Sequence, residues 1–177
     1  MKRPAVPTEL APLVELVQQY VQTCPIIGSF PVMRGASTPN LTGHCANAAS
    51  LFWYMVGGAK TGWKNMRLPG TLDARRKPKA PRRSLWKYGP HAFVLHEPSG
   101  TVVDPTEGQF PASIAIPYGR AEGGTSGGFR KNASGQTVPP TKVLLAAQDL
   151  WTDPWAKDAV LRAMEWSRGG WDGRRGR

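Results

Sequence analysis

The chain has 177 residues, of which 40% are hydrophobic and 20% charged, and its formal net charge is +11. This length is typical of one domain that buries about 70% of the surface of its unfolded chain, without support from disulfides or a metal. Two cysteines are too few for the disulfide scaffold of a small secreted protein, and neither a signal peptide nor an apolar run that could span a bilayer is recognisable. We therefore expect a cytoplasmic protein with no membrane partner.

The positive charge is concentrated in two segments. Seven basic residues and no acid lie in residues 75–87, and four arginines with one acid lie in residues 168–177. The rest of the chain is nearly neutral. Such runs are typical of solvent-exposed segments, so we expect one domain over residues 1–167, followed by a disordered Arg/Gly tail over residues 168–177.

Apolar residues at helical spacing predict a first helix over residues 12–24. Pro12 suits the first position of a helix, and Pro25 ends it. Cys24 lies at the C-terminal end, where the helix dipole disfavours a thiolate, so we interpret it as a core residue. Residues 25–41 have no sustained period and predict a loop.

A second helix is predicted to begin at Cys45 and to stop at Gly57-Gly58. Its apolar face is formed by Cys45, Ala48, Ala49, Phe52 and Val56. Because the unpaired amides and the dipole of a helix N-terminus favour a negative charge, a cysteine in the first turn can act as a nucleophile. The alternative is that Cys45 is a small buried core residue, the commoner fate of a free cysteine.

Residues 59–89 lack a clear period and predict a long basic loop. Its basic residues are interleaved with aromatic ones, a combination that can bind phosphates and stack on bases. The candidate contacts to nucleic acid or to an acidic substrate are Arg75, Arg76, Lys77, Lys79, Arg82, Arg83 and Trp86. The alternative is a flexible loop whose aromatic residues pack beside the site.

A β-hairpin is predicted around the turn sequence Glu97-Pro98-Ser99-Gly100, which separates two apolar, β-prone runs. In the register set by this turn, Phe93 pairs with Asp104, and His91 is the diagonal neighbour of Asp104 on the same face. An imidazole and a carboxylate in that arrangement can reach each other. The same register directs His96 to the opposite face, as a surface or packing residue. The other predicted pairs are Val94 with Val103 and Leu95 with Val102.

The last third of the chain carries weaker patterns. Residues 110–118 predict a short strand between two prolines, and residues 119–137 predict a flexible Gly/Ser-rich loop. Residues 143–145 predict a buried strand. Asp153-Pro154 predicts the start of a last helix, which ends at Gly169-Gly170.

Cys45, His91 and Asp104 supply the three parts that thiol catalysis needs: a thiolate, a base for its proton and an acid that orients the imidazole. They lie in the motifs Gly43-His44-Cys45, Gly89-Pro90-His91-Ala92-Phe93-Val94 and Val102-Val103-Asp104-Pro105-Thr106. In type and order these motifs resemble the transglutaminase-like branch of the papain-like cysteine enzymes. That branch also includes arylamine N-acetyltransferases and several protein-glutamine deamidases.

The resemblance implies an α+β fold in which a central helix bearing Cys45 packs on an antiparallel sheet bearing His91 and Asp104. It implies a catalytic triad of these residues that works through a covalent thioester. Asn40, five residues before Cys45, is the candidate side chain for oxyanion stabilisation, beside the Cys45 amide. We expect no cofactor, and no metal either, because the two cysteines and three histidines lack the spacing of zinc ligands.

The leading hypothesis is a thiol acyl-transfer enzyme, either a hydrolase or a transferase, that acts on an amide or thioester of a protein, a peptide or a small molecule. Water as the acceptor gives a cysteine protease (thiol protease), an amidase or a deamidase, and an amine gives a transglutaminase-like transferase. The alternative is a basic nucleic-acid-binding protein with an incidental or inactive triad. A secreted effector or toxin domain on the same fold is a third alternative.

Overall fold

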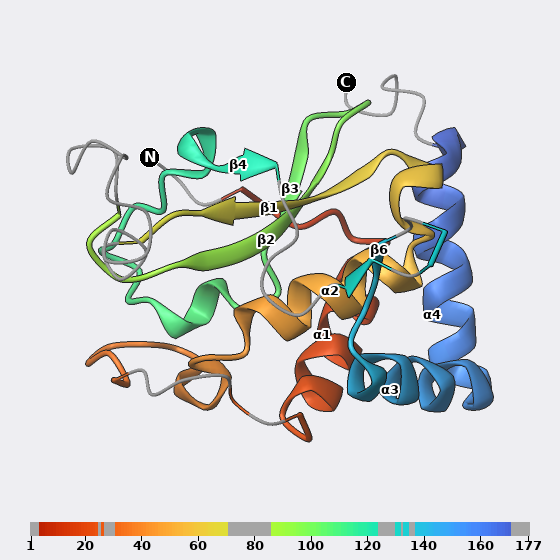
Figure 1. Cartoon of the computed structure of the whole chain (residues 1–177), viewed down its shortest axis with the longest axis horizontal. Coiled ribbons are helices and arrows are strands. Elements are labelled where there is room, and N and C mark those ends of the chain that lie inside the picture. Colours follow the sequence, from red (N-terminus) through yellow and green to blue (C-terminus); the bar gives the residue numbers. More distant parts are fainter. Residues whose placement is uncertain are drawn as a thin grey trace.

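The computed structural model describes residues 4–24, 26, 31–70, 86–123, 130–131, 133–134 and 137–170. These residues form an α+β fold with four α-helices and six strands (Figure 1). The helices are α1 (Ala11–Val21), α2 (Cys45–Met55), α3 (Thr141–Thr152) and α4 (Pro154–Glu165). The strands are β1 (Trp63–Leu68), β2 (His91–His96), β3 (Thr101–Val103), β4 (Glu122–Gly123), β5 (Arg130–Lys131) and β6 (Thr137–Val138).

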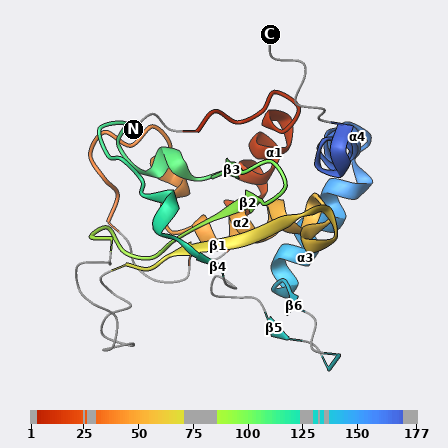
Figure 2. The ribbon, with the colours of Figure 1, turned by 90° about the horizontal axis from the view of Figure 1, so that it is seen from above.

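Four of the strands form one antiparallel sheet in the order β3-β2-β1-β4, and β5 pairs separately with β6. β1 and β2 pair along their whole length, from Trp63 opposite His96 to Leu68 opposite His91. In Figure 1 the sheet lies above α1, α2 and α3, with α4 beside its right-hand end, and Figure 2 shows α2 running behind β1 and β2. One face of the sheet is thus covered by helices.

α2 is the central helix of this layer, because it packs against β2, α1 and α3. Phe52 of α2, Trp63 of β1 and Val94 of β2 are fully buried in the core between helices and sheet. Burial of a side chain of this size contributes about 1.5–3 kcal/mol to stability. A second cluster, formed by Leu68, Trp86, Phe93, Phe110 and Ile116, packs at the end of the sheet where β2 begins.

Four predicted elements are confirmed. The first helix and the Cys45 helix are α1 and α2, and the hairpin joins β2 to β3 with Val94 opposite Val103 and Leu95 opposite Val102. The last helix, α4, begins as predicted after Asp153, whose Oδ1 accepts hydrogen bonds from the amides of Trp155 (2.9 Å) and Ala156 (3.0 Å). These accepted bonds satisfy two of the amides that a helix start leaves unpaired.

Two predicted strands are wrong. Residues 143–145 belong to α3, in which Val143, Ala146, Ala147 and Leu150 recur at helical spacing and are buried. Leu145, by contrast, is 55% exposed, as expected for a residue on the outer face of a helix. Residues 110–118 form turns without a strand, because Pro111 and Pro117 remove two of the amides that a ladder would need.

The long loop predicted over residues 59–89 is also partly wrong, because Trp63–Leu68 forms the sheet strand β1. The chain leaves this strand at Gly70 and returns at Trp86, where the two residues form an isolated bridge. A Cβ on Gly70 would lie 1.9 Å from the carbonyl carbon of Gly89, so only glycine permits this close approach. This close approach fixes the residues that lead into β2. Residues 71–85 lie outside the described residues, as do most of the Gly/Ser-rich loop and residues 171–177 of the predicted tail.

None of the helices in the described part of the chain has the length and apolar character needed to cross a bilayer.

Candidate active site

Cys45 is the first residue of α2. A 3-10 turn, Pro39–Leu41, delivers the chain to this point, and Gly43, with φ of +84°, turns it into the helix. His44 precedes the cysteine as the N-cap residue; it is buried, and burial lowers the pKa of its imidazole. The Cys45 side chain is partly exposed and packs against the edge of the core, so the thiol lies at a helix start as predicted.

The second cysteine differs from Cys45 as predicted. Cys24 is buried just beyond the C-terminal end of α1. Burial raises the pKa of its thiol, against smaller opposing effects of a hydrogen bond from Thr23 and of the charge of Lys142. A thiol in that position is chemically inert near neutral pH and serves as core.

His91 is the first residue of β2, and its side chain is fully buried. Its Nε2 atom lies 2.5 Å from Oδ2 of Asp104, the residue that directly follows β3. Cys45 lies close enough to the imidazole to contribute to the raised pKa of His91. The structure therefore brings the three residues together in the order Cys45, His91, Asp104, and the hairpin register predicts the contact between the last two.

The Asp104 carboxylate is held by a set of hydrogen-bond donors. Oδ1 accepts from the amide of Thr106 (3.0 Å) and from its hydroxyl (3.3 Å). Oδ2 accepts from the hydroxyl of Tyr118 (3.0 Å) as well as facing His91. Hydrogen bonds donated to a carboxylate favour its charged form, and they also fix the orientation of the acid toward the imidazole.

This environment favours a protonated His91. Burial alone would lower the pKa of its imidazole, but the charge and the hydrogen bond of Asp104, with smaller effects of Cys45, raise that pKa to about 10. An imidazolium stabilises a neighbouring thiolate by direct charge attraction. The site can thus store a proton on His91 while Cys45 presents a nucleophile.

Gln109 is a buried site residue that the sequence patterns did not reveal. It lies in the 3-10 turn Glu107–Gln109, five residues after Asp104. Its Nε2 atom lies 3.3 Å from Nδ1 of His91 and donates a hydrogen bond to the hydroxyl of Thr106 (3.0 Å). The only sequence signal would have been its place shortly after the Asp104 motif, since amide side chains carry no distinctive spacing.

Asn40, the residue predicted to stabilise an oxyanion, does not reach the site. It is exposed, and its Nδ2 atom donates to Oε1 of Gln22 (2.9 Å), which follows α1. The turn Pro39–Leu41 directs its side chain toward α1 because Leu41 is the residue that this turn buries. Gln109 occupies the position beside the triad instead.

A small cavity of about 50 Å³ lies beside Cys45. It has room for one or two water molecules. It is mainly apolar, and its wall is formed by Pro31, Met33, Thr42, Gly43, Cys45, Tyr88, Pro90, Gln109 and Phe110. Cys45 and Gln109 thus line a common space into which the reacting group of a substrate can enter.

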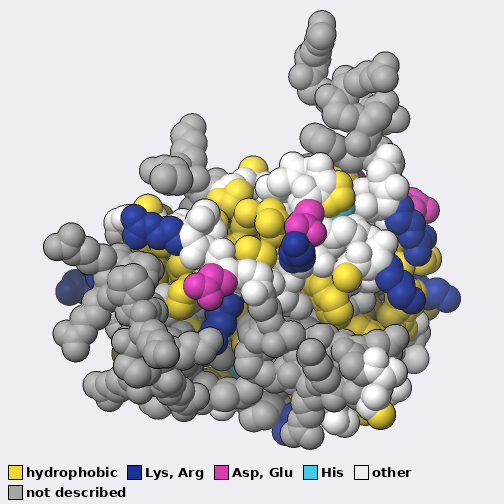
Figure 3. Space-filling model, turned by 45° about the horizontal axis from the view of Figure 1, so that its top comes forward, with side chains coloured by type: hydrophobic (Ala, Val, Ile, Leu, Met, Phe, Trp, Pro, Cys, Tyr) yellow, Lys and Arg dark blue, Asp and Glu magenta, His cyan; other side chains and the backbone are white. Residues whose placement is uncertain are grey.

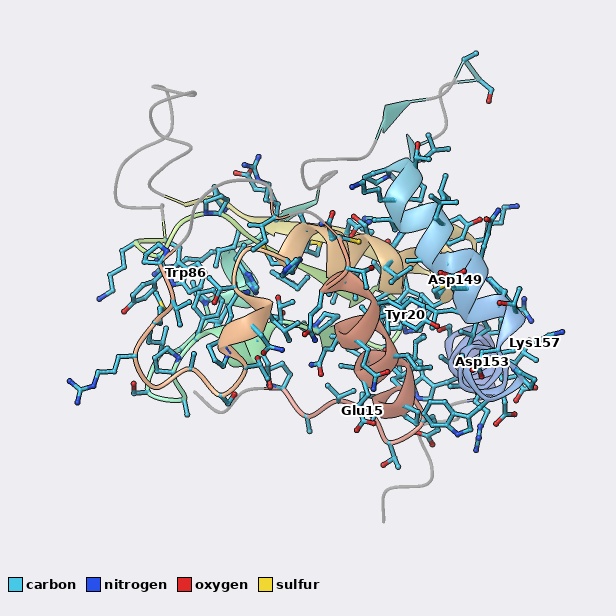
Figure 4. All side chains as sticks on the ribbon, turned by 90° about the horizontal axis from the view of Figure 1, so that it is seen from below. Glu15, Tyr20, Trp86, Asp149, Asp153 and Lys157 are labelled. Carbon is cyan, nitrogen blue, oxygen red and sulfur yellow. The ribbon has the colours of Figure 1, made fainter. Side chains whose placement is uncertain are left out.

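Trp86 packs against the triad. Its ring centroid lies 5.7 Å from that of His91 and 4.7 Å from that of Phe110, and only 8% of the residue is exposed (labelled in Figure 4). The Trp86 ring thus packs beside the site, as the alternative interpretation of this segment expects, and it is not free to stack on a base. A contact of Trp86 with an acidic substrate stays a prediction. The other predicted contacts, Arg75 to Arg83, lie outside the described residues.

On the face shown in Figure 3, the lysine and arginine side chains of the described residues are dispersed among apolar and neutral ones. Within the described part of the chain, no three histidine, cysteine or acidic side chains lie close enough together to hold a metal ion. His96 packs on Trp63 and Trp166, with hydrogen bonds to Ser99 and to the carbonyl oxygens of Thr61 and Ser167. It is a packing residue remote from Cys45.

No family model matches this chain, and no curated protein and no solved structure matches it either. The resemblance to transglutaminase-like and papain-like enzymes therefore stays a prediction from the sequence motifs around Cys45, His91 and Asp104.

Proposed function

We propose that this protein is a thiol acyl-transfer enzyme of the transglutaminase-like and papain-like type, with Cys45 as nucleophile. The observation that carries the proposal is the position of His91, which binds the Asp104 carboxylate and lies close enough to Cys45 for the two to interact. The three residues come from the start of α2, the start of β2 and the position after β3. The central helix that begins at the cysteine, packed on a sheet that carries the histidine, supports the same relation.

In the first half-reaction, the thiolate sulfur attacks the carbonyl carbon of an amide or thioester. The carbonyl oxygen becomes an oxyanion, and the backbone amide of Cys45, which has no acceptor within α2, can donate to it. His91 gives its proton to the departing amine or thiol as the bond to the carbonyl carbon breaks. The products are a thioester on Cys45, a released amine or thiol, and a neutral imidazole.

In the second half-reaction, water or an amine attacks the thioester carbonyl, and His91 takes the proton that the attacking group loses. The Cys45 thiolate is the leaving group. The role of Asp104 in both steps is to hold Nε2 of His91 and to balance the charge of the imidazolium. Nδ1 is thereby the ring nitrogen that serves the thiol and the substrate.

Gln109 is the side chain best placed to assist the oxyanion. The residue lines the cavity beside Cys45, and its amide nitrogen lies 3.3 Å from Nδ1 of His91. Because Nδ1 of the protonated His91 cannot accept a hydrogen bond, an amide hydrogen of Gln109 is available to another acceptor. A developing oxyanion in the cavity is such an acceptor.

The test of the proposal is site-mapped alkylation of the folded protein with iodoacetamide at about pH 6, where an unperturbed thiol of pKa about 8.5 is almost entirely protonated. We expect rapid labelling of Cys45 and slow labelling of Cys24. In His91→Ala, Cys45 should be labelled as slowly as Cys24. Incubation with a thioester such as an acyl-thiophenol should then add the acyl mass to Cys45. Equal, slow labelling of both cysteines in a folded protein would refute an activated thiol.

A further inference from the structure

A second, larger pocket opens next to the catalytic cavity. Its volume is about 370 Å³, within the range of pockets that hold small molecules. Its wall is formed by Trp86, Lys87, Tyr88, Ser113, Ile114, Ala115, Pro117 and Arg120. We call it the Lys87/Arg120 pocket.

Tyr88 connects the two cavities, since it lines both of them. The ammonium group of Lys87 lies over its ring, 4.8 Å from the ring centroid. This is a cation–π contact, which holds the charge at one place. A positive charge thus lies above the side chain that separates the larger pocket from the space beside Cys45.

The Lys87/Arg120 pocket is also tied to the triad on both of its sides. On one side, Trp86 packs against the His91 ring. On the other side, Arg120 belongs to the short 3-10 turn Tyr118–Arg120, whose Tyr118 donates a hydrogen bond to Asp104. A group bound in this pocket therefore has a defined position relative to the reacting atoms, as a substrate substituent requires.

The charge of the pocket has one sign. Lys87 and Arg120 are its charged wall residues, and neither forms an ion pair with any acid in the described part of the chain. The rings of Trp86 and Tyr88 and the side chains of Ile114 and Pro117 give apolar surface, and Ser113 adds a hydroxyl. Such a wall fits an apolar or planar group that ends in an anion.

We propose that the Lys87/Arg120 pocket binds an anionic substituent of the substrate, a carboxylate or a phosphate, while the reacting carbonyl lies at Cys45. This inference rests on the proposed function. Because neither cation touches the reacting atoms, the pocket selects the substrate through its binding and leaves the chemical step to the triad. Lys87 and Arg120 are thus specificity residues.

The test compares two alkylating probes that differ in charge alone. N-(4-carboxyphenyl)iodoacetamide carries an anion, and N-(4-carbamoylphenyl)iodoacetamide replaces it by a neutral amide of the same shape. In both, the thiolate sulfur displaces iodide and forms a carbon–sulfur bond. The second-order rate constant at Cys45 is measured for each probe by mass spectrometry, and the ratio of the anionic to the neutral probe is the readout.

The diagnostic variant is Lys87→Gln/Arg120→Gln. Both residues are exposed, so we expect the fold to be retained. We expect the rate ratio to fall about fivefold, the size typical of ion pairs at a solvent-accessible site. The matched control is Lys60→Gln/Lys157→Gln, which removes the same net charge from exposed positions. Figure 4 shows Lys157 at the opposite side of the molecule from Trp86, so this control should leave the ratio unchanged.

A ratio in Lys87→Gln/Arg120→Gln that equals the wild-type ratio would overturn the proposal, and so would an equal fall in the control variant. Salt gives a second measurement on the unmodified protein, since raising it from 0.02 to 0.5 M should lower the ratio in the wild type and not in the diagnostic variant. A third probe, 4-(iodoacetamido)phenyl phosphate, distinguishes the two anions. A larger ratio for it assigns the pocket to phosphate, and a smaller one to carboxylate.

The two proposals fail in different ways. If Cys45 is not activated, the neutral probe reacts slowly at pH 6 and His91→Ala changes nothing, yet the rate ratio can still be measured at higher pH. If the pocket does not bind anions, the neutral probe still reports an activated thiol and only the ratio loses its dependence on Lys87 and Arg120.

Discussion

The Nε2 atom of His91 lies 2.5 Å from Oδ2 of Asp104, and both side chains are buried. The two residues are 13 positions apart. His91 is the first residue of β2, and Asp104 directly follows β3, the other strand of the same hairpin. A buried charge requires a partner of opposite charge at hydrogen-bond distance, and this pair supplies one for each member. Much of the chemistry expected of the site depends on this contact.

Asp104→Asn should remove the charge that holds His91 protonated. An amide of the same shape cannot balance an imidazolium, so Cys45 alkylation at pH 6 should fall toward the rate of Cys24. Acyl transfer should drop at least about 100-fold. The matched control is Tyr118→Phe, which removes one hydrogen bond to Asp104 and keeps its charge. It should lower the rate by about tenfold or less. Similar losses in both variants would contradict a special role of the charge.

The same pair predicts a pH dependence of stability. The pKa of His91 is about 10 in the folded protein, and an unperturbed imidazole has a pKa of about 6.5. Between these values the folded state holds a proton that the unfolded state lacks. The stabilisation that this proton gives the folded state is therefore complete below a pH of about 6.5 and is lost as the pH rises toward 10. The free energy of unfolding falls over this range by at most about 1.4 kcal/mol per pH unit.

Denaturant unfolding between pH 6 and 10 measures this slope. His91→Gln alone would leave the buried Asp104 carboxylate without a partner, so the suitable comparison is His91→Gln/Asp104→Asn. We expect the free energy of unfolding of this double variant to fall less steeply with rising pH than that of the wild type. Identical pH profiles of wild type and double variant would show that the pair binds no extra proton on folding.

Gln109→Leu separates transition-state stabilisation from activation of the thiol. Alkylation forms no oxyanion, so iodoacetamide should label Cys45 at nearly the wild-type rate. Acyl transfer forms one, and its kcat should fall about 100- to 1,000-fold. Asn40→Ala, at the exposed residue bonded to Gln22, is the control and should change neither rate. Equal losses of alkylation and acyl transfer in Gln109→Leu would instead show that Gln109 orients His91.

The parts of the site that the sequence predicts are those encoded over short distances. The helix period places Cys45 in a first turn, and a four-residue turn fixes the register that brings His91 to Asp104. Asn40 and Gln109 lie equally close to triad members along the chain, yet only Gln109 reaches them. The difference depends on which way a 3-10 turn points when it packs, and no local pattern encodes that.

The strand β1 was not predicted from the sequence, for a different reason. Trp63 packs in the core between the helices and the sheet, whereas Met66 and Leu68 pack in the aromatic cluster on the other side of the sheet. A strand that is covered on opposite faces at its two ends has no simple alternation of apolar and polar residues. The Lys87/Arg120 pocket could not be predicted from the sequence either, because its wall combines residues 86–88 with residues 113–120 only after folding.

The helix α3 provides the sharpest test of the part of the fold that sequence patterns missed. Leu150 is fully buried and Leu145 is 55% exposed, which a helix explains and a buried strand over residues 143–145 does not. Leu150→Ala should lower the free energy of unfolding by about 2–5 kcal/mol, because it removes buried methyl groups and leaves a cavity. Leu145→Ala should change it by no more than about 0.5 kcal/mol. Urea unfolding of both variants measures these values, and a larger loss in Leu145→Ala would mean that residues 143–145 are packed as the strand pattern suggested.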